Sequence, residues 1–138
     1  PKFQEELQVV KLTTSNKEVK LNKILNAEEI VFFQDLIRKI PVADNVIEYA
    51  VKLVNKTRLN SEFSSEVSKK YLQWGAGPRA SQYLIIGAKC HAAIHGKFSP
   101  DIEDVRAIAS PIIRHRVVLN YKAEAEGVSV EDIIKQLL

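Results

Sequence analysis

The chain has 138 residues, of which 46% are hydrophobic and 27% are charged, and its formal net charge at pH 7 is +3. These proportions are typical of one globular domain, so they argue against a disordered chain, a collagen-like repeat and a disulfide scaffold. The small positive charge is spread along the chain without a basic or acidic tail, which argues against nucleic acid as a partner.

A short helix is expected from the start of the chain to about Leu12, followed by a polar, lysine-rich linker over 13–23. A second helix begins after the cap Asn26 and ends before Pro41, with apolar residues along one face. A third helix runs from about Asp44 to Arg58. Each of these helices is expected to carry apolar residues along one face.

Residues 59–70 are rich in serine and charge and predict a surface loop or a frayed helix extension. A glycine-rich turn then leads into a helix that begins near Pro78 and ends at Gly96. Because that helix is apolar or small apart from Gln82 and Lys89, we expect it to be the central, buried helix. Trp74, just before the turn, is expected to pack in the core rather than to stack on a base.

The C-terminal third of the chain predicts further helices. Ser99-Pro100-Asp101 resembles a capped helix start, and Pro111 breaks or bends that helix before a last turn over 112–118. Residues 117–121 are β-branched enough for a short strand, although no partner strand is evident. Ser129 caps a final amphipathic helix. The expected fold is an all-α bundle of about five to seven helices.

Cys90 is the single cysteine and stands in an apolar run, which predicts a buried thiol in a reducing, cytoplasmic compartment. The longest apolar stretch, 83–94, is too short and too polar to cross a membrane. No signal peptide or membrane anchor is recognisable. The chain begins without methionine and contains none, so we expect it to be a segment of a longer protein.

The turn from Gly75 to Ser81 is the strongest candidate for a binding site. A helix start presents unpaired N–H groups and the positive end of the helix dipole, and glycines allow a ligand to approach the backbone. Arg79 adds a cation whose planar fork suits a phosphate. On local chemistry alone, a tight loop with a solvated arginine is the more frequent alternative.

Two other groups of residues have the composition of a site. His91 and His95 are four apart on one helix face, which is a zinc-compatible spacing, but no third ligand follows, so we expect packed or hydrogen-bonded histidines and no metal. Arg114, His115 and Arg116 follow Pro111 near a helix end. They could contact phosphates of a nucleic acid, cap helix carbonyls, or contact a neighbouring subunit or domain, and we favour a structural or subunit role.

Several segments, in this order along nearly the whole chain, resemble the C-terminal lid of MoxR-type AAA+ ATPases. They are residues 54–58, the turn 75–81 with its apolar helix, 99–105 and 112–116, while residues 1–13 resemble the segment that leaves the ATPase core. The resemblance implies a helical AAA+ lid over 14–138. It also implies that Arg79 is the sensor 2 arginine, which reaches the nucleotide phosphates, supported by Gly75, Gly77 and Pro78. The family usually has serine where this chain has Gly77, which predicts a more flexible turn.

The resemblance implies ATP and Mg²⁺ as cofactors, held by a core domain that this sequence lacks. We find no G-x-x-x-x-G-K-[ST] phosphate loop and no strand ending in paired acids, so this chain alone is expected to hydrolyse no ATP. The implied partners are the chain's own AAA+ core, a homo-oligomeric ring, expected to be a hexamer, and proteins with a von Willebrand factor A domain. The implied role is chaperone-like remodelling or insertion of metal cofactors. The alternative function is a free-standing helical adaptor or DNA-binding module.

Overall fold

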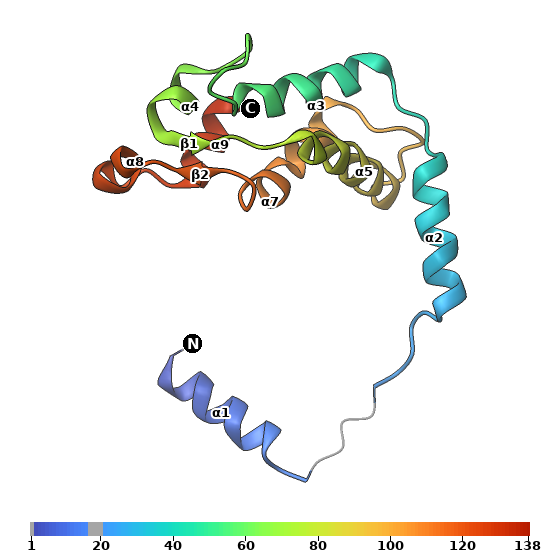
Figure 1. The fold of residues 1–138 in the computed structure, drawn as a ribbon. Helices are drawn as coiled ribbons and strands as arrows, with labels where there is room; N and C mark the ends of the chain where they lie inside the picture. The colour runs from blue at the N-terminus through green and yellow to red at the C-terminus, as the bar shows by residue number, and fades with distance from the viewer. Residues whose placement is uncertain (1, 17–20) are drawn as a thin grey trace. The chain divides into compact units, whose positions relative to one another are not determined.

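The computed structural model describes residues 2–16 and 21–138 and divides the chain into two compact units, one ending at Ile30 and one running from Val31 to Leu138. The described residues form nine helices and a two-stranded sheet (Figure 1). The elements are α1 (Phe3–Thr13), α2 (Ala27–Lys39), α3 (Asp44–Lys56), α4 (Glu66–Tyr71), β1 (Leu72–Trp74), α5 (Pro78–Ile94), α6 (Ile102–Ala107), α7 (Ala109–Ile113), β2 (Val118–Leu119), α8 (Tyr121–Glu126) and α9 (Val130–Leu137). The expected all-α fold class is therefore confirmed.

The first helix lies where the sequence predicts it. The Glu5 side chain accepts a hydrogen bond from the backbone N–H of Lys2 at 2.9 Å, which satisfies one of the unpaired groups at the start of α1. Neither α1 nor α2 contains a buried residue, so the expected apolar faces are present but lie exposed. Pro1 and the middle of the predicted linker, 17–20, lie outside the described residues. Within the described chain, no helix has the length and apolar character that a bilayer crossing demands.

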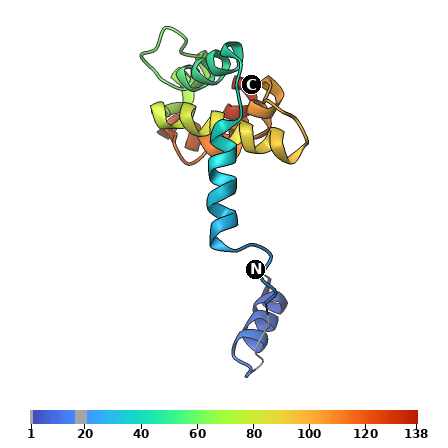
Figure 2. The same ribbon diagram turned by 90° about the vertical axis from the view of Figure 1, so that its right-hand side faces the viewer.

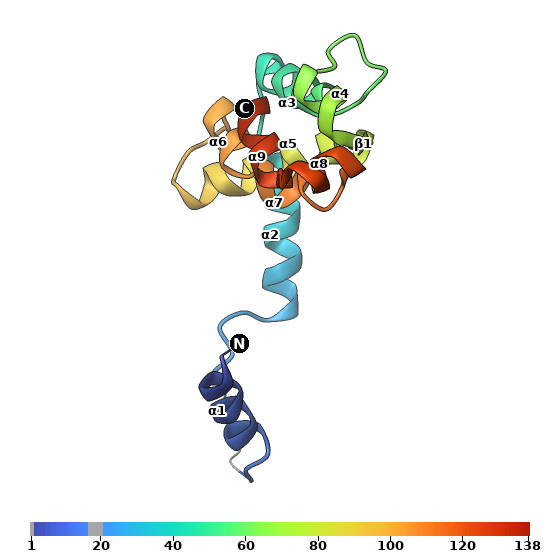
Figure 3. The same ribbon diagram turned by 90° about the vertical axis from the view of Figure 1, so that its left-hand side faces the viewer.

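The core of the larger unit is built around α5. Four buried residues of α5 recur at every fourth position, Ala80, Leu84, Ala88 and Ala92, and form a ridge that contacts α3, α6 and α7. Figure 3 shows α5 and α9 in the middle of this unit, with α6 on one side and α4, β1 and α8 on the other. The expectation of a central, buried helix is correct for this ridge but wrong for the opposite side, where Arg79, Gln82, Tyr83 and Ile94 are exposed.

The end of α5 follows the glycine signal in the sequence. Gly96 has φ +73°, in the left-handed region, and the next backbone N–H, of Lys97, donates to the Ala92 carbonyl at 2.8 Å. This reverse turn directs the chain back toward α6. The cap of α6 is Asp101 rather than Ser99, and the break before α7 falls at Ile108. Pro111 therefore sits in the first turn of α7, where a missing N–H leaves no helical hydrogen bond unmade.

The C-terminal helix closes the core against α3. Tyr49 donates its hydroxyl hydrogen to the Leu138 carbonyl at 3.4 Å, and the Lys56 ammonium donates to the Leu137 carbonyl at 2.8 Å. Figures 1 and 2 show the C-terminal end of α9 beside α3. The buried residues of α9 are Ile133, Ile134 and Leu137. These contacts join the start and the end of the larger unit.

Two short helices and one strand were not expected from the sequence. Within the predicted loop 59–70, Ser65 accepts a hydrogen bond from the Ser68 backbone and starts α4. The predicted strand at 117–121 does find a partner, because β2 pairs antiparallel with β1. Asn120 then caps α8. Trp74 lies at the end of β1 and is 67% exposed, so the expectation that it packs in the core is wrong.

Candidate functional site

The glycine turn before α5 is tied to the end of α3. Ala76 donates its backbone N–H to Thr57 Oγ1 at 2.9 Å, and the Thr57 hydroxyl donates to the Val54 carbonyl at 2.6 Å. Arg58 Nε donates to the Ala76 carbonyl at 2.9 Å. Thr57 is fully buried, so this buried polar group is satisfied at both ends. The turn before α5 is therefore held at Ala76 by side chains that lie 18 and 19 residues before Ala76 in the chain.

The two glycines of the turn have different structural roles. A Cβ atom at Gly75 would lie 2.2 Å from the Thr57 carbonyl oxygen, so only glycine fits against the end of α3. A Cβ atom at Gly77 would meet no atom within 4 Å. Gly77 is the N-cap of α5, with φ −80° and no side-chain cap. A serine would therefore fit at this position, where the family that the sequence resembles usually has one.

Arg79 lies in the first turn of α5, directly after Pro78. Its side chain is exposed, and α5 is 17 residues long with no acidic residue in its first turn. Across the described residues, no carboxylate oxygen lies within 4.0 Å of a charged nitrogen of Arg79. The positive end of the helix and an unpaired guanidinium therefore coincide.

The structure brings Arg79 together with Arg116, which lies 37 positions later in the sequence. Both line a pocket of about 360 Å³ whose other walls are Gly77, Ala80 and Tyr83. The Arg116 guanidinium carbon lies 5.0 Å from the centre of the Tyr83 ring, a cation–π contact. Sequence reasoning did not find Tyr83, although it stands one helical turn after Arg79 and therefore on the same face of α5.

The three residues of the segment Arg114-His115-Arg116 differ in their surroundings. Arg114 and His115 are exposed, whereas Arg116 is partly buried. Arg116 also contacts His115, with 2.6 Å between its Nη1 atom and His115 Nε2. Its Nε atom is shielded from solvent and has no hydrogen-bond partner among the described residues. The segment is therefore split between the surface and the pocket of Arg79.

Charge and hydrogen-bonding capacity at this pocket suit an anion. Neither Arg114 nor Arg116 has a carboxylate oxygen within 4.0 Å in the described part of the chain. Two guanidinium groups offer planar forks of N–H donors, which match phosphate oxygens. The residues present therefore fit the phosphate groups of ATP.

The histidines of α5 take part in a hydrogen-bonded network. His91 Nδ1 lies 2.7 Å from Asp104 Oδ1, and the Lys97 ammonium donates to both Asp104 oxygens at 3.1 Å. His95 Nδ1 lies 2.7 Å from the His91 carbonyl oxygen. Three metal-ligating side chains do not meet anywhere in residues 2–16 and 21–138. Cys90 is partly exposed rather than buried.

Asp104 is a fully buried carboxylate at the start of α6. Burial raises its pKa, but hydrogen bonds from the Asp101 backbone, His91 and Lys97 outweigh burial and lower the pKa to about 2. In turn, hydrogen bonds to Asp101 and Asp104 raise the pKa of Lys97. The network therefore joins the end of α5 to α6 through a charge that persists at neutral pH.

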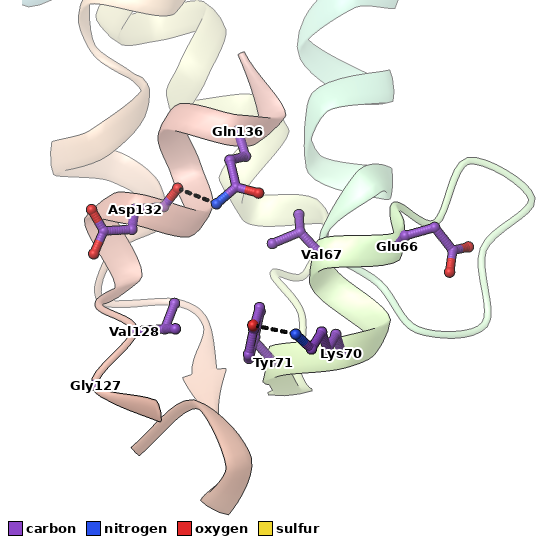
Figure 4. Close-up of a pocket in the computed structure, with 8 residues that line it drawn as sticks. All are labelled: Glu66, Val67, Lys70, Tyr71, Gly127, Val128, Asp132 and Gln136. Atoms are coloured by element: carbon purple, nitrogen blue, oxygen red, sulfur yellow. Dashed lines mark hydrogen bonds between the residues drawn. The ribbon is translucent and has the colours of Figure 1, made fainter. Parts of the chain in front are cut away.

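Two other pockets differ from the arginine pocket because their basic side chains already donate hydrogen bonds within the chain. One pocket, of about 460 Å³, is lined by residues of α4, of α9 and of the segment before α9 (Figure 4). There the Lys70 ammonium donates to the Tyr71 hydroxyl at 2.6 Å. The Tyr71 hydroxyl donates to Glu126 and lowers the pKa of that carboxyl group. The other, of about 420 Å³, is lined by Arg58, which binds the Ala76 carbonyl and Asn55. Neither pocket offers an unpaired arginine.

Comparison with known proteins points to one family. A family model described as the AAA lid domain matches residues 64–137. Chaperone MoxR1 of Mycobacterium tuberculosis is 31% identical over 118 residues, which are 81% of this chain and 31% of that protein. Protein YeaC of Bacillus subtilis, described as uncharacterized, is 27% identical over 139 residues, covering 100% of this chain and 41% of YeaC.

A solved structure supports the same relationship. The crystal structure of a protein from Cytophaga hutchinsonii, described as a candidate ATPase, matches 98% of this chain and 41% of that chain with a TM-score of 0.79 at 30% identity. The chain thus spans less than half the length of each of these relatives. The helical fold, the family match and the likeness to MoxR1 together show that the chain belongs to the AAA lid domain family, as the C-terminal lid of a MoxR-like AAA+ ATPase.

Proposed function

We propose that this lid closes over ATP and Mg²⁺ held by the ATPase core of a longer protein, and that Arg79 senses the terminal phosphate. The observation that supports this most directly is the position of Arg79, exposed and without a carboxylate partner among the described residues, beside a pocket at the start of α5. AAA+ ATPases generally bind ATP with Mg²⁺, so the expected ligand and the positive pocket agree in charge.

In this proposal the lid contributes binding and electrostatic stabilisation rather than a nucleophile or a base. ATP supplies the phosphoryl group, and the guanidinium of Arg79 offsets the negative charge that the phosphate oxygens carry. The hydrogen bonds from Thr57 and Arg58 fasten the turn before Arg79 to the end of α3. A displacement of the Arg79 backbone would therefore move α5 together with α3. Loss of the terminal phosphate would therefore change the position of the lid as a rigid body.

The test is steady-state ATP hydrolysis by the full-length protein with Arg79→Ala. We expect kcat to fall by about 100-fold, because a charged donor at the phosphates is lost. Arg38→Ala is a matched control, because Arg38 is an exposed arginine that does not line the pocket, and it should keep the wild-type rate. A wild-type rate for Arg79→Ala in a folded protein would refute the proposal.

The partners follow from the same family membership. AAA+ proteins typically form rings, and we propose a homo-oligomeric ring, expected to be a hexamer, in which Arg114 and His115 contact a neighbouring subunit or the core. Both side chains are exposed near the end of α7, as such contacts require. We also propose residues 1–13 as the connection from the core and 14–138 as the lid, in a cytoplasmic protein.

For the cellular role we propose chaperone-like remodelling of protein complexes or insertion of metal cofactors, together with a partner that carries a von Willebrand factor A domain. The support is the likeness to a protein named a chaperone, MoxR1. Purification of the full-length protein under native conditions, with and without ATP, would test this. Co-purification of such a partner that depends on ATP is expected, and its absence in both states would contradict the proposal.

A further inference from the structure

We infer that Arg116 is a second phosphate-binding residue of the Arg79 pocket, so that the lid binds two neighbouring phosphate groups of a polyphosphate chain. The inference rests on the proposed function, because it assigns the same pocket to the phosphates. The sequence predicts one structural or subunit role for Arg114, His115 and Arg116 together. The inference gives Arg116 a separate role in binding phosphate.

The first support is the shared pocket. Arg79 comes from the first turn of α5 and Arg116 from the segment between α7 and β2, and both line the same pocket of about 360 Å³. Two cations that line one pocket repel each other, which has a free-energy cost that a bound anion offsets. A bidentate pair with one guanidinium uses two oxygens of a phosphate, and a polyphosphate also offers a neighbouring charged group to a second guanidinium.

The second support is the fixed position of Arg116. Its guanidinium stacks on the Tyr83 ring with 5.0 Å to the ring centre, and its Nη1 atom lies 2.6 Å from His115 Nε2. A side chain that is already ordered loses less conformational entropy when it binds a ligand. Arg116 is thereby held at the pocket before any phosphate arrives.

The third support is a contrast with two arginines of the larger unit whose side-chain donors are taken up by hydrogen bonds within the chain. Arg58 binds the Ala76 carbonyl and Asn55, and Arg106 binds Glu103, Tyr49 and the Leu138 carbonyl. Among the described residues the Arg116 guanidinium interacts only with the rings of Tyr83 and His115, and, like Arg79 and Arg114, it has no carboxylate oxygen within 4.0 Å there. Its charge is therefore not compensated by the part of the lid that the structure describes.

The experiment is a calorimetric titration of the 138-residue chain with inorganic tripolyphosphate at low ionic strength, where charge interactions are least screened. The chain can be used alone because its larger unit encloses its own core. We expect tripolyphosphate to bind at least tenfold more tightly than orthophosphate. Arg79→Ala and Arg116→Ala should each weaken tripolyphosphate binding about tenfold, the loss expected for one charge-assisted interaction.

Three further variants separate a specific site from general positive charge. Arg38→Ala removes an exposed arginine outside the pocket and should change the affinity less than twofold. Arg116→Lys keeps the charge but loses the planar fork, so it should still weaken binding several-fold. Tyr83→Leu removes the ring under Arg116 and should weaken binding in the same direction. Thermal unfolding by circular dichroism checks that each variant is folded.

Two results would overturn the inference. One is a folded Arg116→Ala variant that binds tripolyphosphate no more weakly than Arg114→Ala, because a diffuse basic surface would lose equally from either change. The other is a wild-type chain that binds tripolyphosphate no more tightly than orthophosphate. Neither result would decide the proposed role of Arg79, which is tested separately by ATP hydrolysis in the full-length protein.

Discussion

Asp104 is a buried charge that depends on its neighbours. It accepts hydrogen bonds from Lys97 and from the Asp101 backbone, and His91 lies 2.7 Å away. Because its pKa is about 2 in the folded chain against 3.8 for the free side chain, the unfolded chain binds more protons between these values. The stabilisation that the Asp104 charge contributes is therefore fully present above about pH 4 and is lost as the pH falls toward 2.

The first prediction follows from that pKa difference. Asp104→Asn should lower the free energy of unfolding at pH 7 by about 2 kcal/mol, and the difference from wild type should shrink as the pH approaches 2. Urea denaturation across this pH range measures it. Glu103→Gln is the matched control, because Glu103 is exposed and its ion pair with Arg106 contributes little. A deficit of equal size at pH 7 and pH 2 would contradict a role for the Asp104 charge.

Among the elements, α5 combines packing and function on different faces. Its buried positions, Ala80, Leu84, Ala88 and Ala92, are mostly alanine, which lets neighbouring helices approach closely. Tyr83 and Arg79 stand on a more exposed part of the same helix and line the pocket. The helix therefore couples the core of the lid rigidly to the proposed phosphate contacts.

Substitutions on the two faces of α5 should differ sharply in their effect on stability. Leu84 is fully buried, so Leu84→Ala should lower the free energy of unfolding by about 3 kcal/mol through lost burial and a cavity. Ile94→Ala, on the same helix but at an exposed position, should change it by less than about 0.5 kcal/mol. Chemical denaturation compares the two. Equal losses would show that the buried ridge of α5 does not organise the core.

For the whole molecule, the stability of the lid should reside in the residues after α2. The buried residues of the structure begin at Val46 and end at Leu137, while α1 and α2 contribute none. Val42 packs against this cluster and stands just before α3. Among the described residues, the chain from Val42 to the C-terminus therefore contains every member of the hydrophobic core cluster and every partly buried hydrophobic residue that packs against it.

Truncation tests this distribution. A chain of residues 42–138 should unfold cooperatively within a few degrees of the 138-residue chain, because it loses no buried side chain. A chain of residues 1–128 should not fold, because it loses Ile133, Ile134 and Leu137 from the core. Thermal unfolding followed by circular dichroism measures the stability of both truncated chains. Failure of 42–138 to fold would mean that the N-terminal helices stabilise the lid.

Local sequence signals were sufficient for most of the helices. Periodic apolar residues and caps placed α1, α2, α3, α5, α6 and α9, and Gly96 marked the end of α5, because these features act within a few residues of each other. The short helix α4 was missed because a six-residue helix carries too little periodicity to stand out from its polar surroundings. The prediction of a cation at the start of α5 used the same kind of local signal, because Arg79 directly follows the glycine turn and Pro78.

Contacts between distant segments could not be predicted from the sequence, because they form only when the chain is folded. Strand β2 is stable only beside β1, whose partner residues lie more than forty positions earlier, and Trp74 stays exposed because its strand is at the surface. The meeting of Arg116 with Arg79 and Tyr83 depends on how α7 packs against α5. The amino-acid sequence thus specifies the helices and the arginine at the helix start through short-range chemistry, whereas the two-arginine pocket exists only because packing brings separate helices together.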